Sequence, residues 1–200
     1  GIEQFRIGHE RGASQDHSRI IRLAQHQSEY AALAPQAYET WHELEEQSGQ
    51  RLVIKTGGLV IEASEERDPA KVGTRNVDGY VATFEEHGFD YELLEPEELI
   101  SRWPQFRLKG NERIVYQKDS GIVDARKANA THVALARAQG ARILEETPVR
   151  SVRPSGAGVE VVTDHETFFA DRVVITADAW TNNVLEGVGL RLPLTVTQEQ

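Results

Sequence analysis

Segments with a helical spacing of apolar side chains alternate along this chain with short apolar runs of the kind that form strands. Residues 28–47 and 68–87 have the helical spacing, residues 125–139 are alanine-rich and also predict a helix, and the runs RLVIKTGGLVIEA, YELL and RIVYQ between them are typical of β-strands. No internal repeat or low-complexity tract interrupts this order. The alternation predicts α/β units toward both ends of the chain and a separate α+β insertion in the middle.

Proline and glycine mark where several of these segments are expected to end. Pro35 falls inside the first helical segment, which predicts a break or a second helix start near it. Gly49 is expected to stop that helix, and residues 56–58 (Thr-Gly-Gly) are expected to form a turn or bulge between two strands. Further strands are expected in GIVDA, ARILEETPVRSV, GVEVVTD, ETFFA and DRVVITA, and short helices in PEELISRW and TNNVLEGVG.

The composition limits the classes of protein and of site. The net charge is −10, whereas a protein that binds duplex nucleic acid or a membrane surface needs a basic face. The chain has no cysteine, which excludes disulfides, thiolate metal sites and cysteine nucleophiles within it. No apolar run has the length of a membrane span and no signal peptide opens the chain, so we expect a soluble, cytoplasmic protein. Because methionine is absent and both ends are abrupt, we expect a piece of a longer protein.

Glu3 lies at the end of a short apolar run, just before a loop. In dinucleotide-binding folds a carboxylate in this place accepts hydrogen bonds from the hydroxyls of a ribose. The glycine-rich turn of such a fold would lie about 20 residues upstream, before residue 1. On this evidence alone, a solvated glutamate at a strand end is the stronger interpretation.

The block GASQDHSRIIR combines residues that suit a ligand site. Gly12 and Ala13 allow the backbone to approach a ligand closely, and serine, glutamine and histidine side chains follow them. Arg19 and Arg22 are three residues apart, so on a helix they would share one face. Arginine offers a fixed charge and a bidentate fork to a carboxylate or phosphate. Without further context, a solvated basic edge is the stronger interpretation.

A third candidate is DRVVITADAWTNNVL, in which an apolar run, small residues, an aromatic residue and a helix start follow one another. A connection of this kind between strand and helix allows the backbone to contact a cofactor. The alternative is ordinary strand–loop–helix packing with Trp180 in the core. The seven histidines show no metal-ligand spacing, so we expect no metal site. Neither a nucleophile elbow nor a P-loop is present.

Taken in order, these segments resemble the flavin-dependent amine oxidases of the D-amino-acid-oxidase superfamily. The branch most similar is that of the monomeric sarcosine oxidases and N-methyl-tryptophan oxidases. The resemblance runs through nearly the whole chain, and the ordered set is more specific than any one piece. It rests on IEQF, SQDHSRIIRLA, ETWHELEEQSG, KTGGLVIE, LLEPEELISRWPQF, DSGIVDARKANATHVALARAQGARI, ETPVRSV and ADRVVITADAWT.

The resemblance implies part of a Rossmann-like FAD-binding domain with an inserted mixed-sheet substrate domain. Residues 1–27 and 123–187 would belong to the FAD-binding domain, and residues 28–122 to the substrate domain. Residues 188–200 would begin the return to the substrate domain. The phosphate-binding glycine turn would precede residue 1. The covalent flavin cysteine and an oxygen-activating lysine would follow residue 200, so this segment alone is expected to be inactive.

The resemblance also implies roles for individual residues. Arg19 matches a catalytic arginine beside the flavin ring, and Arg22 matches the arginine that pairs with the substrate carboxylate. Cofactor contacts are implied at Glu3, Gln4, Ser14, Ser18, Val149, Ala177 and Trp180.

Two positions depart from the family pattern. A glycine of the family is Asp178 here, and a carboxylate beside a pyrophosphate would be repelled. A common histidine-glycine pair is replaced by Gln15 and Asp16. We therefore expect Asp178 to point away from the phosphates or FAD binding to be altered, and the substrate to differ in detail.

The activity implied is FAD-dependent oxidation of a secondary amine or amino acid, with O2 as the electron acceptor and H2O2 as a product. A dehydrogenase that uses another electron acceptor and a flavin-free binding module are the alternatives. The sequence identifies neither the amine nor the oligomeric state, and a peroxisomal location stays open.

Overall fold

The structure is a computed structural model that describes residues 1–63 and 76–197. The chain divides into two compact units. Unit 1 consists of residues 1–17 together with the chain from Arg126 onward, and unit 2 consists of Ser18–Ala125. The assignment of segments to FAD-binding and substrate domains stays a prediction. The mixed α/β class that the alternation of segments predicts is confirmed.

Unit 2 contains two small antiparallel sheets. The first has the order β1-β6-β2, formed by Arg19–Ile21, Gly121–Val123 and Val53–Lys55. The second has the order β3-β5-β4, formed by Gly58–Glu62, Arg113–Gln117 and Glu92–Leu94. In each sheet the central strand is the last of the three in the sequence, so both sheets depend on pairing between distant segments.

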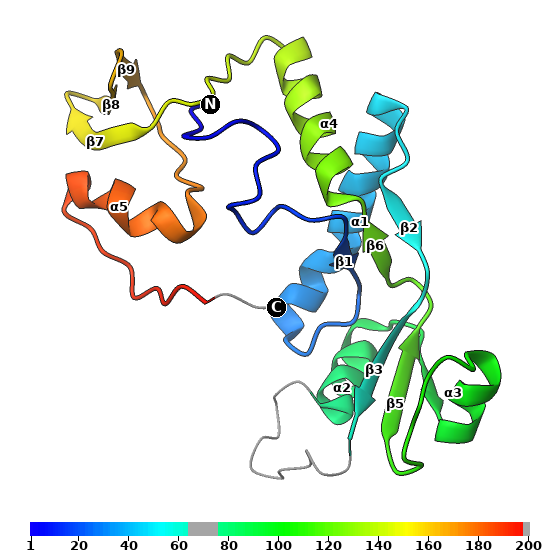
Figure 1. Ribbon diagram of the computed structural model, residues 1–200. Coiled ribbons are helices and arrows are strands. Elements are labelled where there is room, and N and C mark those ends of the chain that lie inside the picture. The colour runs from blue at the N-terminus through cyan, green and yellow to red at the C-terminus, as the bar shows by residue number, and fades with distance from the viewer. Residues whose placement is uncertain (64–75, 198–200) are drawn as a thin grey trace. The chain divides into compact units, whose positions relative to one another are not determined.

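Two helices cover opposite faces of the sheet β3-β5-β4, as Figure 1 shows. Alternate side chains of β5 point to opposite faces. Val115 packs against Tyr80 and Phe84 of α2 (Val77–His87), whereas Ile114 packs against Leu99 of α3 (Pro96–Arg102). All five side chains are at most 3% exposed, so this three-layer arrangement is the main apolar core of unit 2.

Helix α1 (Ser28–Ser48) continues through Pro35, so the predicted break is wrong. The proline ring lies on the exposed side, while Ala31 and Ala34 on the other side are buried. Burial of that face offsets the single backbone hydrogen bond that proline removes. Gly49 ends the helix as predicted, with a positive φ of 66° that favours glycine.

The two strands predicted around residues 56–58 are present, but they do not form a hairpin with each other. β2 pairs with β6, whereas β3 pairs with β5, because the chain passes from one sheet to the other at Gly57 and Gly58. Gly57 has a φ of +73°, and a Cβ there would lie 2.5 Å from the ring of Tyr116. The crossing therefore requires glycine at this position.

Helix α4 (Ala125–Ala138) lies in unit 1 from its second residue onward, and unit 1 also contains the antiparallel meander β7-β8-β9, formed by Val149–Ser155, Gly158–Thr163 and Thr167–Ala170. The 3-10 turn η3 (Asp178–Trp180), helix α5 (Thr181–Leu185) and the 3-10 turn η4 (Glu186–Val188) follow. Both α5 and η4 contact β7. Among the helices of residues 1–63 and 76–197, none combines the length and apolarity that a membrane span requires.

Other local predictions are wrong or fall partly outside the described residues. DRVVITA, residues 171–177, forms no strand, and Val174 is 84% exposed because no described segment pairs with this run. The apolar run that ends at Glu3 forms no regular strand and contributes one parallel bridge, between Ile2 and Leu144. The helix predicted for residues 68–87 is confirmed as α2 from residue 77, and residues 68–75 lie outside the description.

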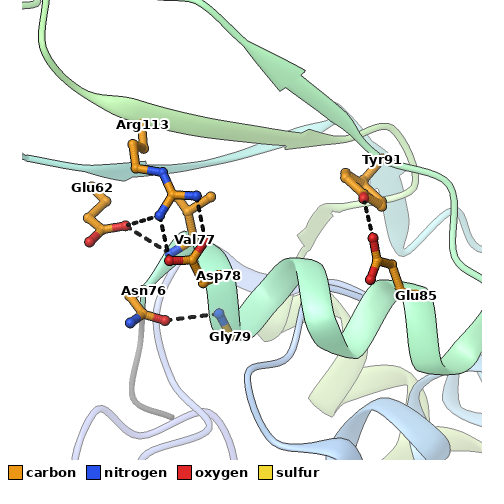
Figure 2. Close-up of polar contacts among 8 residues, drawn as sticks. All are labelled: Glu62, Asn76, Val77, Asp78, Gly79, Glu85, Tyr91 and Arg113. Carbon is orange, nitrogen blue, oxygen red and sulfur yellow. Dashed lines mark hydrogen bonds and ion pairs between the residues drawn. The ribbon is translucent and has the colours of Figure 1, made fainter. Parts of the chain in front are cut away.

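Polar contacts at the start of α2 join that helix to the neighbouring strands (Figure 2). The Asn76 side chain accepts a hydrogen bond from the backbone N–H of Gly79 at 2.9 Å and caps the helix. The buried carboxylate of Glu62, on β3, accepts the N–H of Val77 at 3.1 Å. Arg113, on β5, pairs with Asp78. The contacts of Asn76 and Glu62 satisfy N–H groups that the helix itself leaves unpaired, and the Arg113–Asp78 pair adds a side-chain link between β5 and α2.

Replacing the capping side chain tests how much this network stabilises unit 2. Asn76→Ala in the full-length protein should lower the free energy of unfolding by about 1 kcal/mol, because an N–H of the first turn loses its acceptor. Asn76→Asp is the matched control, since it keeps an acceptor oxygen. Urea unfolding followed by circular dichroism measures both, and equal stability of Asn76→Ala and wild type would contradict the capping role.

Candidate functional site

Unit 2 contains a cavity of about 240 Å³ between its two sheets and α2. Its apolar wall includes Ile20, Ala24, Val60, Phe84, Val115 and Ile122. Its polar side chains are those of Arg22, Thr56, Gln117 and Ser120. An apolar cavity with a few convergent polar groups is the usual form of a small-molecule site.

The charge of this cavity is opposite to that of the whole chain. Among the described residues that line it, Arg22 is the only charged one, and none is aspartate or glutamate. The chain as a whole has a net charge of −10. A cation facing an apolar cavity without a compensating acid favours an anionic ligand, because the Coulomb attraction is only weakly screened there.

Arg22 is held against Tyr80 of α2. Its Nη1 lies 3.5 Å from the Tyr80 hydroxyl, and its Cζ lies 5.9 Å from the centre of the tyrosine ring. Tyr80 is 3% exposed, and the edge of the His26 ring packs on it with 5.7 Å between ring centres. The guanidinium therefore has a packed aromatic support, while most of its hydrogen-bond donors are not used by Tyr80.

Another part of the cavity wall comes from the turn at residues 117–121, which joins β5 to β6. The Tyr38 hydroxyl of α1 donates a hydrogen bond of 2.5 Å to the carbonyl of Asp119. The backbone N–H groups of Thr56 and Gly57 donate to the carbonyl of Ser120 at 3.2 and 2.9 Å. Contacts from α1 and from the connection between β2 and β3 therefore hold the turn in place. They also fix the position of its side chains that face the cavity.

Arg19 and Arg22 do not share a helix face, so that prediction is wrong. Arg19 begins strand β1, where side chains alternate between two faces, and Arg22 follows the strand's last residue. Two residues that are three positions apart in extended chain point to opposite sides, so the two arginines do not share a face. Arg22 lines the cavity together with Ile20, whereas Arg19 is exposed and does not line it. Ser18 directly precedes the strand and is exposed.

In unit 1, Glu3 is held in a defined position. Its backbone N–H donates to the carbonyl of Leu144 at 2.8 Å, and its carbonyl accepts the N–H of Thr147 at 2.9 Å. Its carboxylate Oε1 accepts the N–H of Phe5 at 2.9 Å and lies 3.6 Å from Nε2 of His9. Both contacts involve the same carboxylate oxygen, Oε1, and a carboxylate fits the hydroxyl pair of a ribose.

Phe5 is the centre of an aromatic cluster that sequence reasoning did not assign. The His9 ring lies edge-on at 4.8 Å between ring centres, and the Trp180 ring at 5.6 Å. The guanidinium of Arg11 lies 4.7 Å above the Phe5 ring. His9 and Arg11 show no spacing that would mark them in the sequence, whereas Trp180 was predicted to lie near the cofactor.

Asp178 adopts a positive φ of 47°, a conformation that glycine accepts most readily. Its Oδ2 accepts the backbone N–H of Ala13 at 2.7 Å, and its carbonyl accepts the hydroxyl of Thr181 at 2.7 Å. The carboxylate is therefore directed at the loop that holds Gly12 and Ala13. A carboxylate at this loop can accept hydrogen bonds from hydroxyl groups of a ligand, whereas it would repel a phosphate.

The other residues predicted to contact a cofactor are placed in unit 1. Gln4 follows Glu3, Ser14 receives a hydrogen bond from Asn129 at its carbonyl, and Ala177 precedes η3. Val149 begins β7 and pairs with Thr163. Their cofactor contacts stay predictions. Within the described ranges, no three histidine, aspartate or glutamate side chains come together as a metal site requires.

Titration of Tyr38 should show how strongly the 117–121 turn depends on α1. Burial, with a further contribution from the negative charge of Asp119, raises the pKa of Tyr38 to about 12. Its hydrogen bond should therefore stabilise the fold below about pH 10 and be lost as the pH rises toward about 12.

The free energy of unfolding of wild type and Tyr38→Phe, measured at about pH 9 and about pH 11, checks this expectation. The difference between the two proteins should shrink at the higher pH. Tyr30→Phe, at an exposed tyrosine of the same helix, is the control. A difference that stays constant with pH would contradict the role of Tyr38.

Comparison with known proteins places this geometry in a family. Residues 2–200 match the model of the DAO family, FAD dependent oxidoreductase. Peroxisomal sarcosine oxidase of Mus musculus is 32% identical over 96% of this chain and 47% of its own length. Monomeric sarcosine oxidase of Arthrobacter sp. is 30% identical over 96% of this chain and 48% of its own length.

A solved structure is also similar. NikD, an amino acid oxidase of nikkomycin biosynthesis, superposes with a TM-score of 0.84 at 27% identity, covering 96% of this chain and 48% of NikD. The chain thus spans about half the length of the relatives that it matches. Because the family model extends over nearly every residue, the chain belongs to the DAO family of FAD-dependent oxidoreductases.

Proposed function

We propose that the full-length protein is an FAD-dependent oxidase of a small secondary amine or amino acid. The observation that carries the proposal is the cavity of unit 2, in which Arg22 is the only charged lining residue among those described. A substrate with a carboxylate beside its amine satisfies this charge. Similarity to sarcosine oxidases and to an amino acid oxidase supports the same class of substrate.

In this proposal each arginine of unit 2 has a separate role. Arg22 binds the substrate carboxylate through its guanidinium fork, and Tyr80 limits the positions that the fork can take. The apolar wall around Phe84 and Val115 excludes water from the carbon chain of the substrate. Arg19, exposed at the start of β1, supplies positive potential beside the flavin ring, as the family resemblance implies.

Glu3 has the role of binding the adenosine ribose, since its carboxylate is fixed at the end of the Ile2–Leu144 bridge. Bound FAD supplies the electron acceptor for oxidation of the carbon–nitrogen bond. Water hydrolyses the resulting imine to a carbonyl compound and an amine, and O2 takes up the two electrons as H2O2.

Anaerobic mixing of the full-length protein with N-methylated amino acids tests the proposed reaction. Bleaching of the flavin absorption bands, followed by stoichiometric H2O2 on admission of air, is the expected result. Bleaching without H2O2 would identify a dehydrogenase that uses another electron acceptor. A full-length protein that takes up no FAD would contradict the oxidase and favour a flavin-free binding module.

Substitution of Arg22 tests the carboxylate contact. Arg22→Ala should raise KM for an amino acid substrate roughly 10- to 100-fold, because one or two charge-assisted hydrogen bonds are lost. Arg22→Lys should recover part of the loss, since it keeps the charge without the fork. Arg107→Ala, at an exposed arginine that does not line the cavity, is the matched control. An unchanged KM in Arg22→Ala would exclude this role.

Substitution of Asp178 tests the effect of its charge on the cofactor. Asp178→Asn keeps an acceptor for the Ala13 N–H and removes the negative charge, so FAD should bind more tightly. We expect a change of roughly 2- to 10-fold in Kd at low ionic strength, decreasing as salt is added. Fluorescence titration of the apoprotein measures Kd, and Asp171→Asn is the control at an exposed aspartate. Equal affinity at every ionic strength would show that Asp178 does not act on the phosphates.

A further inference from the structure

Gln117 is a buried polar residue whose hydrogen bonding is incomplete. Its side chain is 2% exposed and lines the cavity of unit 2. The amide oxygen accepts a hydrogen bond from the Ser120 hydroxyl at 3.0 Å. The amide nitrogen Nε2 has no hydrogen-bond partner among the described residues. An unpaired buried donor destabilises a fold, so its presence in a cavity wall points to a partner that the protein itself does not supply.

The strand register explains why Gln117 faces the cavity. Side chains on β5 alternate, so Gln117 points to the same face as Val115, which packs against α2. Gly58 lies opposite Gln117 on β3, and a Cβ there would meet the Ser120 side chain at 2.6 Å. The glycine thus leaves room for the Gln117–Ser120 pair at the cavity wall.

Two side-chain groups of this cavity can only donate hydrogen bonds. Arg22 and the Nε2 of Gln117 can only donate hydrogen bonds, and the Gln117 oxygen already accepts one from Ser120. A ligand that brings acceptor oxygens satisfies both donors, whereas a ligand that brings only N–H groups satisfies neither. The apolar wall around Phe84 and Val115 suits a hydrocarbon part of the same ligand.

We propose that Gln117 is a second ligand-binding residue of this cavity, which acts with Arg22 to bind the carboxylate of a small acid whose remaining part is apolar. The amide N–H of Gln117 donates to one carboxylate oxygen and the guanidinium of Arg22 to the other. The volume of about 240 Å³ lies below the roughly 300–1,000 Å³ of sites for drug-sized molecules, so the ligand has few heavy atoms. This inference rests on the proposed function and narrows its substrate to amino acids with a short apolar side chain or N-substituent.

The direct test is calorimetric titration of the full-length protein with butyrate, an apolar monocarboxylate that lacks the amine and is not oxidised. Gln117→Leu keeps the size of the side chain and removes the donor. Gln117→Glu keeps an acceptor for the Ser120 hydroxyl and also removes the donor. Gln36→Leu, at an exposed glutamine of α1, is the matched control.

Wild type and Gln36→Leu should bind butyrate alike, and both Gln117 variants should bind it about 10-fold more weakly. Butyramide, the neutral isostere, should bind weakly to all four proteins because it lacks the charge. Melting temperatures of the four proteins check that they are folded.

Equal affinity of wild type and Gln117→Leu for butyrate would overturn the inference. The partner of the Gln117 amide N–H would then be a bound water and not the ligand. Full affinity in Gln117→Glu would overturn it as well, because an acceptor would then be sufficient. No binding of butyrate to wild type would exclude this class of ligand. None of these results depends on flavin reduction, so a failure of the proposed oxidase reaction is detected separately in the anaerobic experiment with amines.

Discussion

Antiparallel pairing of β6 with both β1 and β2 is the contact on which the cavity of unit 2 depends. Three segments about 30 and 70 residues apart in the chain meet in this sheet, with Ile20, Ile122 and Ile54 in one row across it. The pairing brings Arg22, just after β1, to the same cavity as Ser120, just before β6. Loss of this register would separate the positive charge from the turn at residues 117–121, and neither group alone would form a site.

In both units, candidate ligand-binding groups are held in place by the surrounding structure. Arg22 rests on a buried tyrosine, Glu3 is held by backbone contacts to residues near 144–147, and the 117–121 turn is fixed by α1 and by β2–β3. In each case packing or backbone hydrogen bonds set the position of a side chain, and part of its hydrogen-bonding capacity is left for a ligand. Such preorganisation reduces the entropy that is lost on binding.

Regular helices were the part of the fold that the sequence predicted best, because α1 and α2 carry apolar residues at helical spacing and end at glycine, and α4 is rich in alanine. Three-residue strands such as β1 are too short for a period of 2 to be distinguished from a helical spacing, so Arg19 and Arg22 were assigned one face wrongly. Pro35 was misjudged because burial of the α1 face is a tertiary effect. Arg22 was identified by family resemblance. Gln117 lines the cavity, Tyr80 contacts Arg22 and Tyr38 contacts the 117–121 turn, and these contacts between distant segments show in no local pattern.

The central proposal is that the cavity of unit 2 recognises a carboxylate through Arg22, beside which the described lining residues include no aspartate or glutamate. It is tested most directly on the wild-type, full-length flavoprotein by comparing anaerobic flavin reduction by N-methylglycine with that by its neutral amide. The two molecules share the oxidisable C–N bond and differ in the charge at the other end. The account predicts that the second-order rate constant of flavin reduction is lower for the amide than for N-methylglycine by roughly 10-fold or more. Equal values for the two would contradict it.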